Sequence, residues 1–264
     1  MALIEAMIIV ADNLHVIQPA IAKAVQTLDP APIRELALRC IQAGAQALDI
    51  NSGPLSKMPQ ERMRFLVESV QTVTDLPLIL DTTNATAMAA GLEACRGRAT
   101  INGFSLEPAK IERMLPLARQ FDADIIGYLL GANSQVPVEA DEMMAVAVAL
   151  FEQYTQAGLD PARLIIDPVI APLSWQEGAR HNQAVLKVIA GLPDLLGTPV
   201  RTIAGLSNLA TGRLPLERKI TLEQTFLPML AAAGLDMVLT NVLHAPTLQT
   251  ARLCDQLLGD RIFA

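Results

Sequence analysis

The sequence predicts a (β/α)8 barrel, the α/β fold in which eight parallel strands alternate with helices and close into a ring. Short apolar runs alternate eight times with longer amphipathic segments. The chain has 264 residues, an ordinary length for one such barrel, and 52% of them are hydrophobic, enough for a large core. No linker or change of composition divides the chain, so we expect residues 1–264 to form one domain.

Each predicted strand is a short run that is apolar on both faces, as strands of a buried parallel sheet are. Helix signals lie between the runs. Asn84–Cys95 is rich in alanine and ends near Gly97, and Val138–Gly158 carries a long helical stripe with a glycine at its C-cap. The predicted strands are Ile4–Val10, Ala47–Asn51, Leu78–Asp81, Ala99–Asn102, Asp124–Tyr128, Leu164–Asp167, Val200–Leu206 and Met237–Thr240.

Charge and hydropathy exclude two classes of partner. The net charge is −7, the two signs are interspersed and aromatic residues make up 3%, so no surface is suited to nucleic acid. No apolar run reaches the roughly 18 residues of a membrane span. Met1–Val10 carries Glu5 and lacks a basic region and a cleavage site, which indicates a first strand rather than a signal peptide. We therefore expect a cytoplasmic protein.

Cysteines and histidines do not have metal-ligand spacing. Cys40, Cys95 and Cys254 are far apart and form no CxxC motif, and the first two lie in apolar helical patterns. Buried free thiols in a reducing compartment are expected of them. His15, His181 and His244 show no HxH, HxxxH or HExxH pattern, so we expect no metal bound by this chain.

Acidic and carboxamide side chains end most of the predicted strands. In a barrel these ends converge on one face, where active sites lie. A single such residue is often the N-cap of the next helix, and that alternative stays open for Asn84 and Asn241. The strand-end candidates are Asp49, Asn51, Asp81, Asn102, Asp167, Gly205, Ser207, Asn208 and Asn241.

The chemistry of these strand ends favours a flat, nitrogen-rich heterocycle. A shielded carboxylate pairs well with two neighbouring donors, such as an amino-pyrimidine edge. Carboxamides recognise alternating donors and acceptors. The glycine-rich loop that cradles a phosphate is absent from the sequence.

Five short segments carry a resemblance to a known family: Leu48–Pro54, Leu80–Asn84, Ile101-Asn102, Ile166–Pro168 and Gly205–Asn208. In this order and spacing the chain resembles, over nearly its whole length, the pterin-binding barrel superfamily. It is most similar to the methyltetrahydrofolate:corrinoid/iron–sulfur protein methyltransferases. The resemblance implies transfer of the N5-methyl group of methyltetrahydrofolate to, or from, a corrinoid held by a separate protein. It also implies a homodimer.

The resemblance also implies roles for single residues. Asp81 and Asp167 would bind the pterin, Asn102 would support them, and Asn208 would be the catalytic residue that faces N5. The other substrate-binding positions would be Asp12, Asp49, Asn51, Gly205 and Ser207. The sequence holds no corrinoid-binding Asp-x-His-x-x-Gly pattern, so the corrinoid is expected to arrive on another chain.

Ala11–His15 departs from the Gly-Glu-Arg-Ile-Asn loop of the methyltransferases. Asp12 keeps an acid and His15 replaces an asparagine, which leaves the methyl donor open. A methyltransferase with another donor, and a non-catalytic pterin-fold protein, therefore remain alternatives.

Dihydropteroate synthase is the other alternative. Its seventh strand ends in a Ser-Arg-Lys type motif, where this chain has Ser207-Asn208-Leu209, and its Thr-Arg-Pro loop is replaced by Ser52-Gly53-Pro54. Whether Arg213 or Arg218 supplies a cation near the site stays open.

Overall fold

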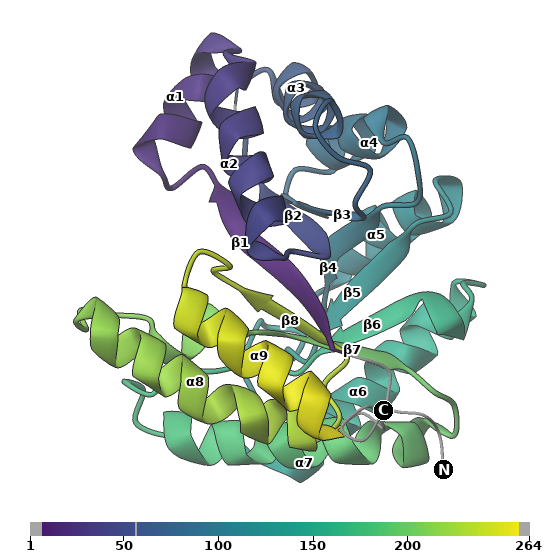
Figure 1. Cartoon of the computed structure of the whole chain (residues 1–264). Coiled ribbons are helices and arrows are strands. Elements are labelled where there is room, and N and C mark those ends of the chain that lie inside the picture. Colours follow the sequence, from purple (N-terminus) through teal and green to yellow (C-terminus); the bar gives the residue numbers. More distant parts are fainter. Residues whose placement is uncertain (1–6, 56, 259–264) are drawn as a thin grey trace.

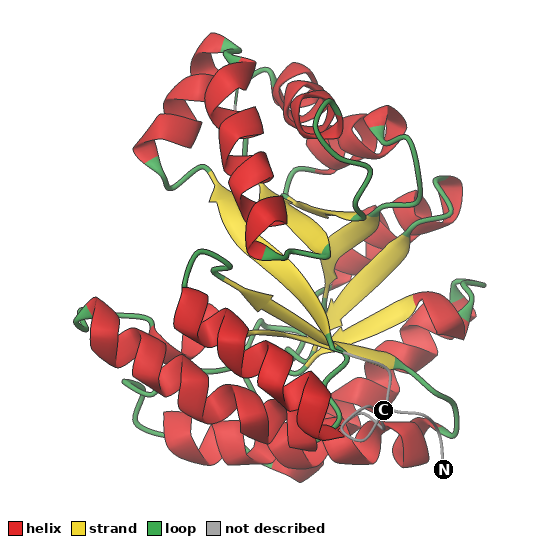
Figure 2. Ribbon diagram, viewed as in Figure 1, coloured by secondary structure: helices red, strands yellow, loops and turns green. Residues whose placement is uncertain are grey.

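Eight parallel strands close into a ring in the computed structural model, which describes residues 7–55 and 57–258. They pair in chain order, and β1 pairs with β8 to close the ring. Figure 1 shows the strands at the centre, and Figure 2 shows the helices around them. The predicted (β/α)8 barrel is therefore confirmed. The strands are β1 Ile8–His15, β2 Ala47–Asn51, β3 Leu78–Asp81, β4 Thr100–Phe104, β5 Asp124–Tyr128, β6 Leu164–Asp167, β7 Arg201–Gly205 and β8 Met237–Thr240.

Helices follow every strand, and two of them lie between β1 and β2. None of the helices in residues 7–55 and 57–258 is long and apolar enough to cross a membrane. The α-helices are α1 Pro19–Thr27, α2 Pro30–Ala43, α3 Pro59–Gln71, α4 Ala85–Ala94, α5 Pro108–Gln120, α6 Ala140–Gln156, α7 Gly178–Leu196, α8 Leu216–Ala232 and α9 Ala245–Leu258. Short 3-10 helices η1 (Pro161–Arg163) and η2 (Leu206–Ala210) precede β6 and follow β7.

The strands are apolar on both faces because each face meets its own core. Inward-facing residues fill the ring, and outward-facing residues pack under the helices in a larger cluster. Near the amino ends of the strands, Arg201 of β7 donates to Asp124 of β5 at 2.6 Å. The inner cluster contains Val10, Ala47, Ile79, Ile126, Ile165, Ile203 and Met237.

Strand β1 is longer than predicted. Residues 4–6 of the predicted run lie outside the described residues, and β1 continues to His15. The predicted first loop, Ala11–His15, is therefore strand. Its pairing with β2 shifts by one bulge between Ala11 and Leu14, and the bulge brings Leu14 into the core at 3% exposure. Asp12 and Asn13 lie in that bulge, and two polar residues in succession there led to the prediction of a loop.

Of the two asparagines considered as N-caps, only one lies directly before a helix. Asn84 is the N-cap of α4, since its side chain accepts from the backbone N–H of Thr86 and Ala87. Asn241 does not cap α9, which begins at Ala245. Helix α8 begins at Leu216, so the segment between β7 and α8 contains residues 206–215.

The cysteines are free thiols in the described residues. Cys40 and Cys254 are buried in α2 and α9. Cys95 is only partly buried, because it follows the last residue of α4 instead of lying on its inner face.

Gly127→Ala should destabilise the barrel. A Cβ at this position of β5 would lie 2.6 Å from the Cδ2 atom of Leu150, where α6 packs against the strand. Overpacking of this kind costs about 1–3 kcal/mol of unfolding free energy. Gly97→Ala is the control, because a Cβ there meets nothing within 4 Å. Urea unfolding of both variants would measure the difference, and equal midpoints would contradict the packing of α6 on β5.

Candidate active site

A ring of polar side chains lies at the carboxyl ends of the strands, directly above the apolar inner cluster. Alternate residues of a strand face the same side, so the residue two positions after each inner apolar residue also faces inward. Val10 is followed in this way by Asp12, and Ile165 by Asp167. The same spacing places Asp49, Asp81, Tyr128 and Gly205 at the mouth of the barrel.

Strands β2, β3 and β4 contribute one connected group. Asn51, Asp81 and Asn102 occupy the same register on the three neighbouring strands. The Asn51 amide donates to the Asp81 carboxylate. Asn102 Nδ2 donates to Asp49 Oδ1 at 3.1 Å. The structure therefore brings these four predicted site residues together.

Tyr128 belongs to the same group and was not predicted as a site residue. It ends β5, opposite Asp167 of β6 in the ladder, and its hydroxyl donates to Asn102 Oδ1. Burial, together with the charges of Asp81, Asp167 and Asp49, raises the pKa of Tyr128 well above its usual value, so the hydroxyl stays a donor. Tyr128 is the last residue of a predicted strand, and this position alone could have marked it as a candidate site residue.

Carboxylates at the mouth are difficult to ionise. Burial raises the pKa of Asp167 to about 7, although a 2.7 Å hydrogen bond from the backbone N–H of Val169 opposes the shift. Burial likewise raises the pKa of Asp81 to about 6. The pKa of Asp49 is raised well above its usual value, first by burial and then by the charge of Asp81.

Asp12 contacts the segment after β7. Burial raises its pKa, and a hydrogen bond with the Ser207 side chain opposes that shift. The neighbouring Asn13 lies in a chain of polar side chains that reaches α8. Asn13 Nδ2 donates to Asn241 Oδ1 at 2.6 Å, Asn241 contacts His244, and His244 lies 3.4 Å from the buried Glu223.

Asn208 lies in η2 and is exposed. Its amide nitrogen is 3.1 Å from the point that a Cβ at Gly205 would occupy. Gly205 therefore leaves room for the Asn208 amide to fold back over the end of β7. The backbone N–H of Leu173 donates to the Leu209 carbonyl at 3.0 Å, which joins the loop after β6 to η2.

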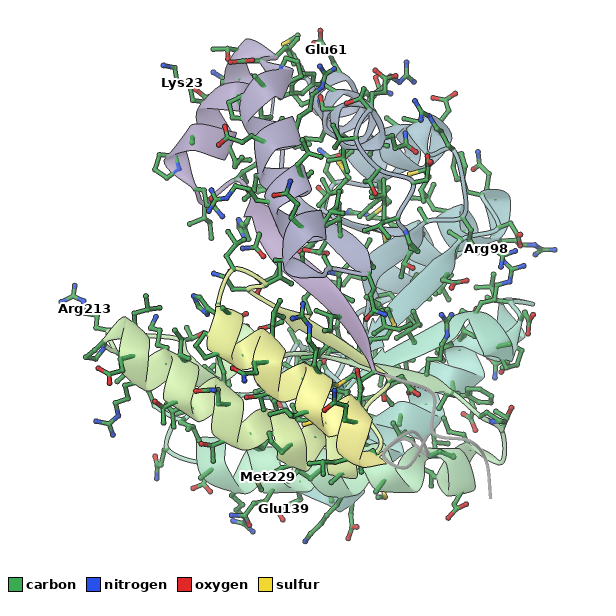
Figure 3. All side chains as sticks on the ribbon, viewed as in Figure 1. Lys23, Glu61, Arg98, Glu139, Arg213 and Met229 are labelled. Carbon is green, nitrogen blue, oxygen red and sulfur yellow. The ribbon has the colours of Figure 1, made fainter. Side chains whose placement is uncertain are left out.

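Three residues with open roles lie outside these contacts. His15 ends β1, its Nδ1 atom accepts from the backbone N–H of Ile17 at 2.9 Å, and burial lowers its pKa. Arg213 and Arg218 are exposed, and Figure 3 shows Arg213 at the outer edge of the molecule, by the start of α8.

The mouth offers hydrogen-bond acceptors to a ligand. The described strands carry no lysine or arginine at their carboxyl ends. Buried carboxylates without a cation gain most from a ligand that brings several N–H donors. The arrangement therefore suits a flat, amino-bearing ring and gives little support to a phosphate.

Sequence comparisons agree with this chemistry. The family model described as "Pterin binding enzyme" matches residues 20–241. The methylcorrinoid:tetrahydrofolate methyltransferase of Eubacterium limosum is 26% identical over 258 residues, which are 96% of this chain and 92% of that protein. The methionine synthase of Mycobacterium tuberculosis is 25% identical over 210 residues, but these are only 17% of that protein.

Solved structures share the fold. The dihydropteroate synthase of Xanthomonas albilineans with 4-aminobenzoic acid has a TM-score of 0.71 and 20% identity, covering 96% of this chain and 94% of that one. The dihydropteroate synthase of Coxiella burnetii has a TM-score of 0.72 and 15% identity, covering 98% and 95% of the two chains. With a family model that matches residues 20–241 of the barrel, this chain belongs to the pterin-binding enzymes.

Proposed function

We propose that this protein transfers the N5-methyl group between methyltetrahydrofolate and the cobalt of a corrinoid on a separate protein. The supporting observation is the ring of carboxylates and carboxamides at the barrel mouth, in which Asp49 and Asn102 are buried, with Asn208 folded over Gly205 beside it. The similarity to a methyltransferase over 96% of the chain points in the same direction. The test is methyl transfer from methyltetrahydrofolate to free cob(I)alamin, monitored through the change in the absorption spectrum of the corrinoid.

The pterin would be held by its amino-pyrimidine edge. Asp167 and Asp81 approach the mouth from β6 and β3, and both carry pKa values raised by burial. Two N–H donors from the ring would replace the missing hydration of such a carboxylate. Asn102 is fixed between Tyr128 and Asp49, and its second amide hydrogen remains for an acceptor on the ring.

Methyl transfer needs a proton at N5. The cobalt electron pair attacks the methyl carbon, the carbon–nitrogen bond breaks, and its electron pair stays on N5. That nitrogen is a poor leaving group unless it gains positive character, and protonation supplies it. The Asn208 carboxamide can accept from N5–H through its oxygen or donate to neutral N5 through its nitrogen. This adaptability suits a residue that contacts N5 in both protonation states.

Displacement of a diphosphate, the dihydropteroate synthase reaction of the alternative, has less support here. Residues 206–215, which follow β7, contain one cation, Arg213, and it lies at the outer edge of the molecule (Figure 3). Methyl transfer from a folate protonated at N5 releases neutral tetrahydrofolate and no diphosphate, so a mouth without cations is compatible with methyl transfer.

A corrinoid protein would dock on the strand-end face, where several large apolar side chains are exposed. They lie in loops after strands or at the helix start that follows, so they surround the mouth. Exposed apolar patches of this kind mark protein interfaces. The residues are Ile17, Met58, Leu173, Trp175 and Leu216.

The single-domain organisation and the homodimer also remain proposals. Helices α8 and α9 lie side by side on the outside of the ring (Figure 1). Met229 of α8 and Leu253 of α9 are exposed there, and Figure 3 shows Met229 on the outer surface. A second copy of the chain would cover these side chains.

Asp167→Asn should weaken binding and stabilise the ligand-free protein at the same time. The amide accepts fewer hydrogen bonds than the carboxylate, so methyltetrahydrofolate affinity should fall by about tenfold or more. Burial raises the carboxyl pKa from 3.8 in the unfolded chain to about 7 in the folded protein, so the ionised carboxylate destabilises the fold. This cost is absent below the unfolded pKa, grows as pH rises and is complete above the folded pKa. At about pH 8 the variant should gain on the order of 2–4 kcal/mol.

Calorimetry would measure the affinity and urea unfolding the stability, each at about pH 5 and about pH 8. The stability difference should shrink toward acid pH, where the wild-type carboxyl holds its proton. A variant that binds methyltetrahydrofolate as the wild type does would remove Asp167 from the binding site.

Asn208→Ala should lower kcat more than it weakens binding. Its contact with N5 strengthens as charge develops on that nitrogen, so it acts mainly on the transition state. We expect a loss of about tenfold to a hundredfold in single-turnover methyl transfer to cob(I)alamin, with methyltetrahydrofolate affinity nearly unchanged. Wild-type rates in this variant would show that another group handles N5.

Trp175→Ser should impair the reaction with a corrinoid protein and spare the reaction with free cob(I)alamin. A buried interface tryptophan contributes enough for the KM of the protein acceptor to rise by about tenfold. Leu38→Ser is the control, because Leu38 is exposed on α2, away from the strand ends. Equal effects of the two substitutions would argue against docking at the mouth.

A further inference from the structure

His181 is a buried histidine whose two ring nitrogens both contact carbonyl oxygens. It lies in the first turn of α7 at 2% exposure. Nδ1 is 2.7 Å from the Pro137 carbonyl and Nε2 is 2.6 Å from the Val169 carbonyl. A neutral imidazole carries one N–H and a protonated ring carries two, so the ring donates to at least one carbonyl in either state. It thus bridges the loop before α6 and the loop after β6.

Val169 is an unusual residue to find in its backbone conformation. Its φ is +63°, in the left-handed region that β-branched residues avoid. Its N–H donates to Asp167 Oδ1 at 2.7 Å, and its carbonyl faces His181. Both polar groups of this residue are therefore held, one by the carboxylate and one by the imidazole. Contacts on both sides are what a strained conformation requires to persist.

The first turn of α7 holds the same loop at two further points. The Asn182 amide donates to the Ala171 carbonyl and accepts from its N–H, both at 2.9 Å. A Cβ on Gly178 would lie 2.2 Å from the Pro172 carbonyl, so the helix start is pressed against the loop. His181 differs from these neighbours because its contact lies on the residue that donates to Asp167.

We propose that His181 is a positioning residue, which holds Val169 in its left-handed conformation so that the Asp167 carboxylate is oriented toward the barrel mouth. The inference rests on the proposed function in one respect, that Asp167 receives the pterin. Without the imidazole, Val169 is free to relax toward negative φ, and its N–H then turns away from Asp167. The carboxylate loses both a fixed direction and its backbone donor.

The test compares His181→Leu with Asn182→Leu. Both substitutions remove a buried polar side chain that holds the same loop, so both should lower the melting temperature. Only His181→Leu should weaken methyltetrahydrofolate binding, by about tenfold, because one donor to a charged group is lost. The loss should appear in KM more than in kcat. His181→Gln, whose amide carries two hydrogens for the two carbonyls, should recover part of the affinity.

A second measurement needs no ligand. Because the Val169 N–H lowers the pKa of Asp167, its loss should raise that pKa, as followed by carboxyl 13C NMR. Apart from His181 itself, the ionisable groups are untouched by either substitution: Tyr128 lies beside Asp167, and Asp81 and Asp49 lie beside Tyr128. The Asp167 titration should move upward in His181→Leu and stay in place in Asn182→Leu.

Equal Asp167 titrations in the wild type and His181→Leu would overturn the inference, whether or not methyltetrahydrofolate binds. Failure of the proposed function has a different signature, in which the wild-type protein does not bind methyltetrahydrofolate while the Asp167 titration still depends on His181.

Discussion

Taking carboxylates out of water at the mouth of a closed apolar ring costs free energy, and this cost explains much of the structure around them. The strand period of two places Asp12, Asp49, Asp81 and Asp167 above the inner core, where Asp49 is buried and the other three are partly buried. Burial is the first cause of the raised pKa in each of them. The carboxylates must therefore accept hydrogen bonds either from other side chains at the mouth or from a bound ligand.

Within the protein, neutral groups donate the hydrogen bonds to these carboxylates. Asn51 donates to Asp81, Asn102 to Asp49, and the backbone N–H of Val169 to Asp167. Each satisfies one acceptor without adding a charge, so the carboxylates keep further lone pairs for a bound ring. A lysine in the same place would lower the carboxyl pKa and would also compete with the ligand for those lone pairs. The choice of amides over cations fits a site for a neutral heterocycle.

The sequence predicted the ring and much of its mouth, because both follow from local patterns. Strands β2, β3, β5, β6 and β8 have their predicted bounds, since a short run that is apolar on both faces has clear ends. The β1 extension escaped prediction because a bulge is set by pairing with β2, which lies more than thirty residues away. The contact of Tyr128 with Asn102 likewise depends on the lateral register of strands.

Asn208 and His181 mark a different limit of prediction. The return of the Asn208 amide over Gly205 depends on η2, a turn that no periodicity announces. His181 lies on a helical stripe as any core residue does, and its importance comes from two carbonyls on distant loops. Residues that act through backbone groups leave no motif, because every residue has the same backbone.

The hydrogen bond between Leu173 and Leu209 has a consequence for the proposed encounter with a corrinoid protein. It fastens the segment after Asp167 to the segment that carries Asn208. Under the proposed function, a partner that docks on Trp175 would move both segments together, and the distance between the contacts to the pterin edge and to N5 would be preserved during the encounter. Part of the entropic cost of aligning donor and acceptor would then be met before they collide, because the two contacts that hold the donor would already be fixed relative to each other.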